Sequence, residues 1–300
     1  MKLSDHLKHL GLTNSEAKKA LLSGKVFLHG IPTADGGRDI QPYQIELRPE
    51  APRLTPGRDL VLVHRDDALI VVWKPSGMLS VPAGKAGGHL NVMGLVGKLT
   101  RSPALAVHRI DQGTSGLMMI ARTETAQLDL KAQLENHSVE RRYIALTHGR
   151  PPGEAWTVSN HLADDRGDGL RGSIEGSPTP RSKHAKTDFV HLERIDKQVN
   201  LVEAKLHTGR THQVRIHLAE GGTPILGDDR YGTAAANRGA SRLCLHAVVL
   251  GIRHPTTGEP IRFTSPIPDS MERLMRSLRH ASVNPSPKRR KSRRPKKRRG

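Results

Sequence analysis

The chain has 300 residues, of which 35% are apolar and 3% aromatic, and its formal net charge is +19. This length accommodates one large and one small domain, and the charge favours a polyanionic partner such as nucleic acid. The single cysteine, Cys244, excludes a disulfide framework and a cysteine-based zinc site. No stretch approaches the roughly 20 apolar residues that span a bilayer, and no signal-peptide pattern is present, so we expect a cytoplasmic protein without membrane contact.

The first 50 residues have the pattern of a small separate domain. An apolar helical repeat near the start is followed by Thr13 and Glu16, the two positions of a capping box. This pair predicts the beginning of a second helix that runs to Leu22. A short apolar run at 26–28 predicts a strand. We therefore expect two helices and a strand within residues 1–50.

This helix–turn–helix–strand order resembles the alpha-L RNA-binding motif of a ribosomal protein and of several RNA-modifying enzymes. A generic helical hairpin would give the same pattern. The resemblance implies that residues 1–50 form a small α/β RNA-binding domain. The lysines expected to contact RNA there are Lys18, Lys19 and Lys25.

The main domain is expected at residues 59–280, after a proline-containing linker at 51–58. Many short β-branched runs with few helices predict an α+β fold on a mainly antiparallel mixed sheet with flanking helices. The Gly- and Pro-rich residues 164–180 have no periodicity and predict a surface insertion. The expected strands are 60–63, 68–73, 139–146, 187–192 and 199–206, and the expected helices are 90–99, 123–135, 211–219 and a last one around 271–278.

Residues 281–300 are predicted to be a disordered basic tail. Residues 288–299 contain ten Lys or Arg and no acidic residue, so the tail supplies about half of the net charge. The rest of the chain is still basic. The tail could contact RNA or act as a nuclear address, and its composition does not separate these alternatives.

Residues 108–116 read HRIDQGTSG and contain a carboxylate that a tight turn could present to a cleft. Apolar residues lead into the segment, and two glycines and two hydroxyl side chains follow Asp111. Such a turn has backbone donors that can fix a carboxylate. From these residues alone, a surface loop with an ion pair between Arg109 and Asp111 is an equal alternative.

Residues 209–217 read GRTHQVRIH and bring together two guanidinium groups, two imidazoles and an amide. Thr211 could cap a helix, and the N-terminus of a helix favours an anion. Arg210 and Arg215 could each bind phosphate or hold a carboxylate ionised, whereas a solvated basic helix face is the alternative. The histidines in and just before this segment are spaced by five residues and do not share a helix face, so we expect no metal site.

Together these segments resemble the RluA-type family of RNA pseudouridine synthases. The family's nucleophile motif is His-Arg-Leu-Asp, two variable residues and Thr-Ser-Gly, and here only Ile110 departs from it. The Gly-Arg-Thr-His-Gln block is intact. The resemblance runs from about residue 60 to residue 268. Its other elements are Lys-Pro-Ser-Gly at 74–77, Tyr-Ile-Ala at 143–145, the run 224–232 and Leu-His-Ala at 245–247.

The resemblance implies isomerisation of uridine to pseudouridine without a metal or an organic cofactor. Asp111 would be the catalytic carboxylate, Arg215 would hold its charge, and Tyr143 would stack on the uracil. A base inside a stack must flip out to reach Asp111, and Arg109 could fill the vacated place. Whether Asp111 attacks the ribose, attacks the base or removes a sugar proton stays open. Other expected contacts are Arg210, His212 and Gln213 to the substrate and Lys74 to RNA.

The expected partner is structured ribosomal RNA, with transfer RNA as the alternative, and the expected state is a monomer. The main rival function is a non-catalytic RNA-binding or ribosome-assembly protein of the same fold. Binding alone would not require Asp111, Tyr143 and Arg215 together. A glycosidase usually needs two facing carboxylates, and a kinase needs a glycine-rich phosphate loop, and neither pattern is present.

Overall fold

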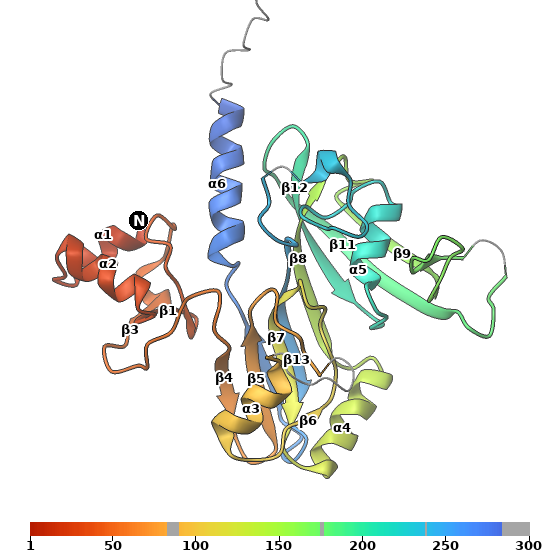
Figure 1. Cartoon of the computed structure of the whole chain (residues 1–300), viewed down its shortest axis with the longest axis horizontal. Helices are drawn as coiled ribbons and strands as arrows, with labels where there is room; N and C mark the ends of the chain where they lie inside the picture. The colour runs from red at the N-terminus through yellow and green to blue at the C-terminus, as the bar shows by residue number, and fades with distance from the viewer. Residues whose placement is uncertain (83–89, 175–176, 238, 284–300) are drawn as a thin grey trace, which may run out of the picture.

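A computed structural model describes residues 1–82, 90–174, 177–237 and 239–283 (Figure 1). The predicted tail therefore lies outside the described residues from position 284 onward, and its first three residues still belong to the last helix. Within the described ranges, no helix combines the length and the hydropathy needed to cross a membrane.

The N-terminal residues form two helices and a separate antiparallel sheet with the strand order β2-β1-β3. The capping box is confirmed: the Thr13 side chain accepts the N–H of Glu16, and the Glu16 carboxylate accepts the N–H of Thr13 at 2.8 Å. A small apolar cluster under the two helices includes Leu3, Leu7 and Leu21. The elements are α1 (Leu3–His9), α2 (Asn14–Leu22), β1 (Val26–Leu28), β2 (Ile31–Pro32), a 3-10 turn (Pro42–Gln44) and β3 (Ile45–Leu47).

The remaining strands form one large sheet with the order β10-β9-β11-β12-β8-β13-β7-β5-β4, to which β14 and β6 add at β13 and β7. Every pair within the described residues is antiparallel except β13 with β7. The predicted α+β fold on a mainly antiparallel sheet is thus confirmed. The strands are β4 (Val61–Arg65), β5 (Leu69–Lys74), β6 (Leu105–Ala106), β7 (Ser115–Ala121), β8 (Glu140–His148), β9 (Ala155–Ala163), β10 (Gly172–Ser173), β11 (Lys183–Arg194), β12 (Val199–Leu206), β13 (Leu245–Arg253) and β14 (Pro260–Thr264).

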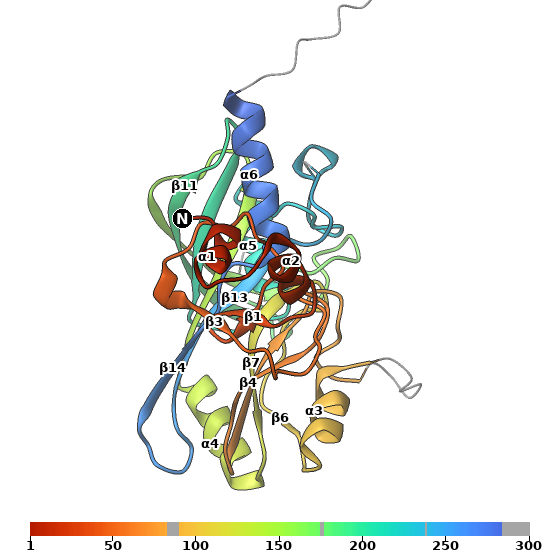
Figure 2. The same ribbon diagram turned by 90° about the vertical axis from the view of Figure 1, so that its left-hand side faces the viewer.

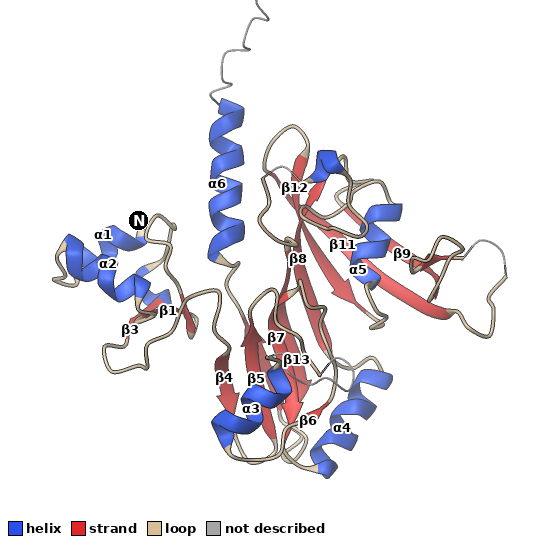
Figure 3. Cartoon of the chain, viewed as in Figure 1, coloured by secondary structure: helices blue, strands red, loops and turns tan. Residues whose placement is uncertain are grey.

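Helices cover both halves of this sheet (Figure 3). In the half made of β4, β5 and β7, the strand β5 is buried throughout. Leu69 and Val71 pack in the cluster with α4, whereas Ile70 and Val72 pack in the cluster with α3, because successive residues point to opposite faces. The helices are α3 (Val92–Thr100), α4 (Glu124–Glu135), α5 (Gln213–Glu220), a 3-10 turn (Ala234–Ala236) and α6 (Asp269–Val283).

Some element predictions need correction. The helix predicted at 211–219 begins at Gln213, because His212 has a left-handed backbone with φ 61° and Thr211 does not cap it. In the large sheet, strands β7, β9, β13 and β14 had no counterpart among the predicted elements, and in the small sheet β3 had none. The insertion predicted at 164–180 contributes β10 at the outer edge of the sheet, and its residues 175–176 lie outside the described ranges.

The N-terminal unit lies beside α6 (Figure 2). It contacts the first turn of this helix through the Asp269 carboxylate. Asp269 accepts hydrogen bonds from the Thr33 hydroxyl and the Ala34 N–H, each at 2.7 Å, and from the Arg38 guanidinium at 3.2 Å. Arg276, two turns further along α6, pairs with Asp35 at 2.7 Å. These polar contacts fix the small sheet beside the base of α6.

We predict that Asp269→Asn loosens this attachment. Hydrogen bonds to a charged group contribute about 1.5–3 kcal/mol each, so the opening free energy of residues 1–48 should fall by about that amount. Amide hydrogen exchange would report this as faster exchange in the N-terminal unit alone. The matched control is Asp67→Asn, since the Asp67 side chain is fully exposed. Unchanged exchange in Asp269→Asn would contradict the assignment.

Candidate active site

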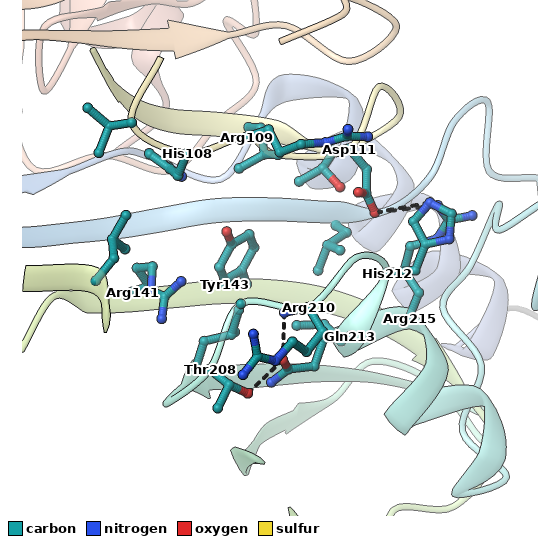
Figure 4. Close-up of a pocket in the computed structure, with 18 of the residues that line it drawn as sticks. His108, Arg109, Asp111, Arg141, Tyr143, Thr208, Arg210, His212, Gln213 and Arg215 are labelled. Atoms are coloured by element: carbon teal, nitrogen blue, oxygen red, sulfur yellow. Dashed lines mark hydrogen bonds and ion pairs between the residues drawn. The ribbon is translucent and has the colours of Figure 1, made fainter. Parts of the chain in front are cut away.

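A cavity of about 470 Å³ is lined by residues from both halves of the large sheet (Figure 4). Its walls are the connection between β6 and β7, the start of β8, and the loop that leads into α5. The structure brings together the three side chains predicted to be catalytic, which are Asp111, Tyr143 and Arg215. The predicted substrate contacts Arg109, Arg210, His212 and Gln213 also line this cavity.

The turn that carries Asp111 is held from behind by the segment after β5. The Ser80 hydroxyl donates to the Ile110 carbonyl at 2.6 Å, and the Ser76 hydroxyl donates to the Gly113 carbonyl at 2.6 Å. Within the turn, the Thr114 N–H donates to the carbonyl of Asp111 at 3.1 Å. The Lys-Pro-Ser-Gly motif and the Asp111 motif are therefore one structural unit, although 37 residues separate Ser76 from Gly113.

Gly116 is required where the Asp111 turn passes into β7. Its φ is +119°, and a Cβ at this position would lie 2.3 Å from the carbonyl oxygen of Ala247. Here β7 meets β13 in the parallel pair of the sheet, with Gly116 opposite Ala247. Glycine alone accommodates both the backbone conformation and the close approach, so the Thr-Ser-Gly part of the motif sets the direction of the chain after Asp111.

Lys74 was predicted to contact RNA, and its burial contradicts this prediction. The residue is fully buried, and its ammonium group donates to the carbonyls of Pro75, Met78 and Gln112 at 3.1, 2.7 and 3.1 Å. Burial lowers the pKa of Lys74 to about 7, against the opposing effect of the Asp111 charge. With all three donors used internally, Lys74 ties the end of β5 to the turn that follows Asp111.

Arg215 lies between two carboxylates. It donates to both oxygens of Asp228, from Nε at 2.8 Å and from Nη2 at 2.7 Å, whereas Nη1 is 3.5 Å from Oδ2 of Asp111. Burial would lower the pKa of Arg215, but the hydrogen bonds and charge of Asp228, with Asp111, raise it. The same contacts hold the pKa of Asp228 below its usual value despite burial. Arg215 is therefore charged, and one nitrogen faces Asp111.

His212 completes the surroundings of Asp111. Its Nε2 is 3.9 Å from the Asp111 carboxylate, and its Nδ1 is 2.9 Å from the hydroxyl of Tyr231. The Tyr231 ring also lies under Arg215, 5.2 Å from the guanidinium carbon. Burial lowers the pKa of His212, although Asp111 opposes the shift. A neutral imidazole beside the carboxylate is the expected state at neutral pH.

Tyr143 stands on β8 at the floor of the cavity. It is 8% exposed, and burial raises the pKa of its hydroxyl to about 12, so the phenol is neutral. Arg141 lies two residues earlier on the same strand and also lines the cavity. At this end His108 is neutral too, because burial and then Arg141 lower its pKa to about 3, and its Nε2 accepts the N–H of Met119.

Gln213 was predicted to bind the substrate, and its hydrogen bonds contradict this. The residue is 2% exposed. Its Oε1 accepts from the Thr208 hydroxyl and the Arg210 N–H at 2.7 and 2.9 Å, while its Nε2 donates to Lys186 and Thr187. Gln213 therefore shapes the loop before α5. Arg210 remains exposed at the cavity and donates from Nε to the carbonyl of His184.

The other predicted contacts differ in exposure. Arg109 is exposed and makes no ion pair with a described residue, so the alternative of a local pair with Asp111 is wrong. Lys18 and Lys19 are exposed on α2, whereas Lys25 is half-buried and donates to the carbonyl of Ala51. A second cavity of about 750 Å³ shares Arg109, Asp111, His212 and Arg215 with the first.

Sequence reasoning did not assign roles to Asp228, Tyr231 and Arg141. Asp228 and Tyr231 belong to the run 224–232. Their contacts with Arg215 depend on how the connection between α5 and β13 folds back onto α5. Arg141 is followed by a second arginine, Arg142, and the residue type alone does not show which of the two faces the cavity. Strand alternation carries the available signal, since residue 141 shares the face of Tyr143 and residue 142 does not.

Comparisons with known proteins identify the family of this chain. The family model described as RNA pseudouridylate synthase matches residues 68–220. A Bacillus subtilis (strain 168) protein named as an uncharacterized RNA pseudouridine synthase is 38% identical over 234 residues, which cover 74% of this chain and 73% of that protein. A Xanthomonas campestris protein named ribosomal large subunit pseudouridine synthase D is 35% identical over 304 residues, covering 90% and 86%.

Among solved structures, Human RNA Pseudouridylate Synthase Domain Containing 4 superposes with a TM-score of 0.60 at 23% identity, covering 73% of this chain and 92% of that one. This likeness supports the fold. The relatives and the family model together establish the activity class. The chain belongs to the RluA-type family of RNA pseudouridine synthases, isomerases that convert uridine in RNA to pseudouridine.

Proposed function

We propose that the Asp111 carboxylate carries out the isomerisation and that Arg215 keeps it charged and oriented. The observation that carries this proposal is the geometry of Arg215, whose Nη1 is 3.5 Å from Asp111 while its other nitrogens are held by Asp228. The Asp111 side chain is 17% exposed, so it can reach a substrate in the cavity. Its three chemical roles (attack on the ribose, attack on the base, removal of a sugar proton) all need an ionised carboxylate.

Tyr143 and Arg109 are proposed to handle the target base. The flipped uracil would lie against the Tyr143 ring, whose hydroxyl makes no hydrogen bond to a described residue. Arg109 is exposed next to Asp111 and would occupy the place that the base leaves, since a guanidinium plane stacks on bases. Arg210 and His212 would contact the substrate from the opposite wall.

The proposed substrate is ribosomal RNA of the large subunit, with transfer RNA as the alternative, and the proposed location is the cytoplasm. The names of three relatives, from Xanthomonas campestris, Zymomonas mobilis and Neisseria meningitidis, refer to the ribosomal large subunit. The net charge of +19 suits a polyanion. We propose that the N-terminal unit binds RNA through Lys18 and Lys19 and that the enzyme acts as a monomer.

Asp111→Asn is predicted to abolish the reaction while the protein remains folded. The amide keeps the size of the side chain but loses the charge, so pseudouridine formation should fall at least about 10³-fold. Mapping pseudouridines in ribosomal and transfer RNA from cells that lack the protein, complemented with either form, measures both activity and substrate. Restoration of the same pseudouridines by Asp111→Asn would exclude the proposed role.

Asp228→Asn is predicted to lower the single-turnover rate constant by about 100-fold, because small misplacements of a catalytic group are costly. It removes the charge that fixes two nitrogens of Arg215. The matched control is Asp229→Asn. Asp229 is also near Arg215, at 3.6 Å, but its side chain is 97% exposed, and we expect a change below about twofold. Equal effects of both substitutions would contradict the positioning role.

Truncation after Val283 is predicted to weaken RNA binding and to make it less dependent on salt. Each phosphate contact that is lost should reduce the slope of log Kd against log salt by about 0.7–0.9. The rate constant with saturating enzyme should not change, since the site described above stays intact. An unchanged slope would show that the basic tail does not contact RNA.

A further inference from the structure

Arg141 is a buried cation without an acidic partner among the described residues. It is 8% exposed and lines the same cavity as Asp111. Its Nη2 is 3.4 Å from the His207 carbonyl, and its Nε is buried without any hydrogen-bond partner. The neighbouring Arg142 is ordinary, because it pairs with Glu140 at 2.7 Å and Glu203 at 2.8 Å. A buried unpaired charge is unfavourable, so an anionic partner is expected from outside the chain.

The position of Arg141 identifies where that anion would lie. Arg141 and Tyr143 are two residues apart on β8 and share one face of the strand. In Figure 4, Tyr143 lies between Arg141 and Asp111. A uracil placed against Tyr143 therefore has Asp111 at one end and Arg141 at the other. No carboxylate of the described chain pairs with Arg141 there, and Glu135, which also lines the cavity, is exposed.

The reaction moves negative charge toward that end of the cavity. When the bond between C1′ of the ribose and N1 of uracil breaks, the electron pair leaves with N1, and the charge spreads to O2 and O4. Asp111 becomes neutral, either as an ester with the ribose or as an acid holding a sugar proton. If Asp111 instead attacks the uracil ring, the electrons pass to C5 and O4 of the uracil. In every case one negative charge leaves Asp111 and appears on the uracil.

We propose that Arg141 binds the uracil and stabilises the negative charge it acquires when it separates from the ribose. The inference rests on the proposed function, because it takes Asp111 as the catalytic carboxylate and Tyr143 as the surface under the base. A fixed cation in a cavity shielded from water stabilises a developing anion strongly, and the uncharged substrate would feel it less. Arg210, exposed at the same cavity, adds positive charge near Arg141.

The test is the single-turnover rate constant of Arg141→Gln with saturating enzyme, using an RNA that contains the mapped target uridine. We expect a decrease of about 100-fold, as for other electrostatic groups that act on the transition state. RNA affinity should stay within about threefold of the wild type, with an unchanged salt slope. The matched control, Arg142→Gln, should react at nearly the wild-type rate. Arg141→Lys should recover part of the loss.

A change of leaving group separates a chemical role from a structural one. Fluorine at C5 makes the uracil anion intrinsically more stable. The decrease in rate constant caused by Arg141→Gln should therefore be smaller when the target is 5-fluorouridine, with the disappearance of the 5-fluorouridine nucleoside as the measured quantity. An equal penalty for both bases would overturn the proposal. Weaker RNA binding and a shallower salt slope with a normal rate constant would also overturn it, because this result would identify Arg141 as a phosphate contact.

The outcomes also distinguish this inference from the proposed function. An active Asp111→Asn enzyme would contradict the proposed function whatever Arg141 does. An inactive Asp111→Asn enzyme together with a wild-type rate constant for Arg141→Gln would leave the role of Asp111 in place and reject the role of Arg141 alone.

Discussion

The double pairing of Arg215 is the interaction on which the rest of the site depends. A carboxylate in a cavity loses hydration and needs a fixed positive neighbour to remain ionised. Arg215 fills this place only because Asp228 holds two of its nitrogens, so that the third faces Asp111. The Tyr231 ring packs against the Arg215 guanidinium, and the Tyr231 hydroxyl is hydrogen-bonded to His212. In the proposed mechanism, Asp228 would thus act on the reaction by holding Arg215 in place.

The turn that presents Asp111 is also held in position by residues from other parts of the chain. It has no regular structure of its own. Its shape comes from the Lys74 ammonium group at the end of β5, from two hydroxyl groups in the segment after β5, and from the contact of Gly116 with β13. Residues of β5, of the segment after it and of β13 therefore position the Asp111 carboxylate. Substitutions in the Lys-Pro-Ser-Gly motif would act on catalysis through the position of Asp111, since Lys74 is buried and cannot reach RNA.

Local features of the chain were predictable, and long-range ones were not. The capping box at Thr13 and the turn after Asp111 follow from neighbouring residues, and the α+β class follows from the density of short apolar runs. The burial of Lys74 and the internal hydrogen bonds of Gln213 depend on segments tens of residues away. From the sequence alone, both side chains were therefore predicted to contact RNA or substrate. The left-handed backbone of His212, after which α5 begins at Gln213, was also not predicted.

In the proposed complex, the uracil lies against Tyr143, with the Asp111 carboxylate at one end and the Arg141 guanidinium at the other. The most direct measurement is a structure of the Asp111→Asn variant bound to an RNA fragment with its target uridine. We predict a flipped uridine in the first cavity, with its ring on Tyr143, its glycosidic bond beside residue 111 and its carbonyl edge toward Arg141. A target uridine in the second cavity, or a phosphate bound to Arg141, would contradict it.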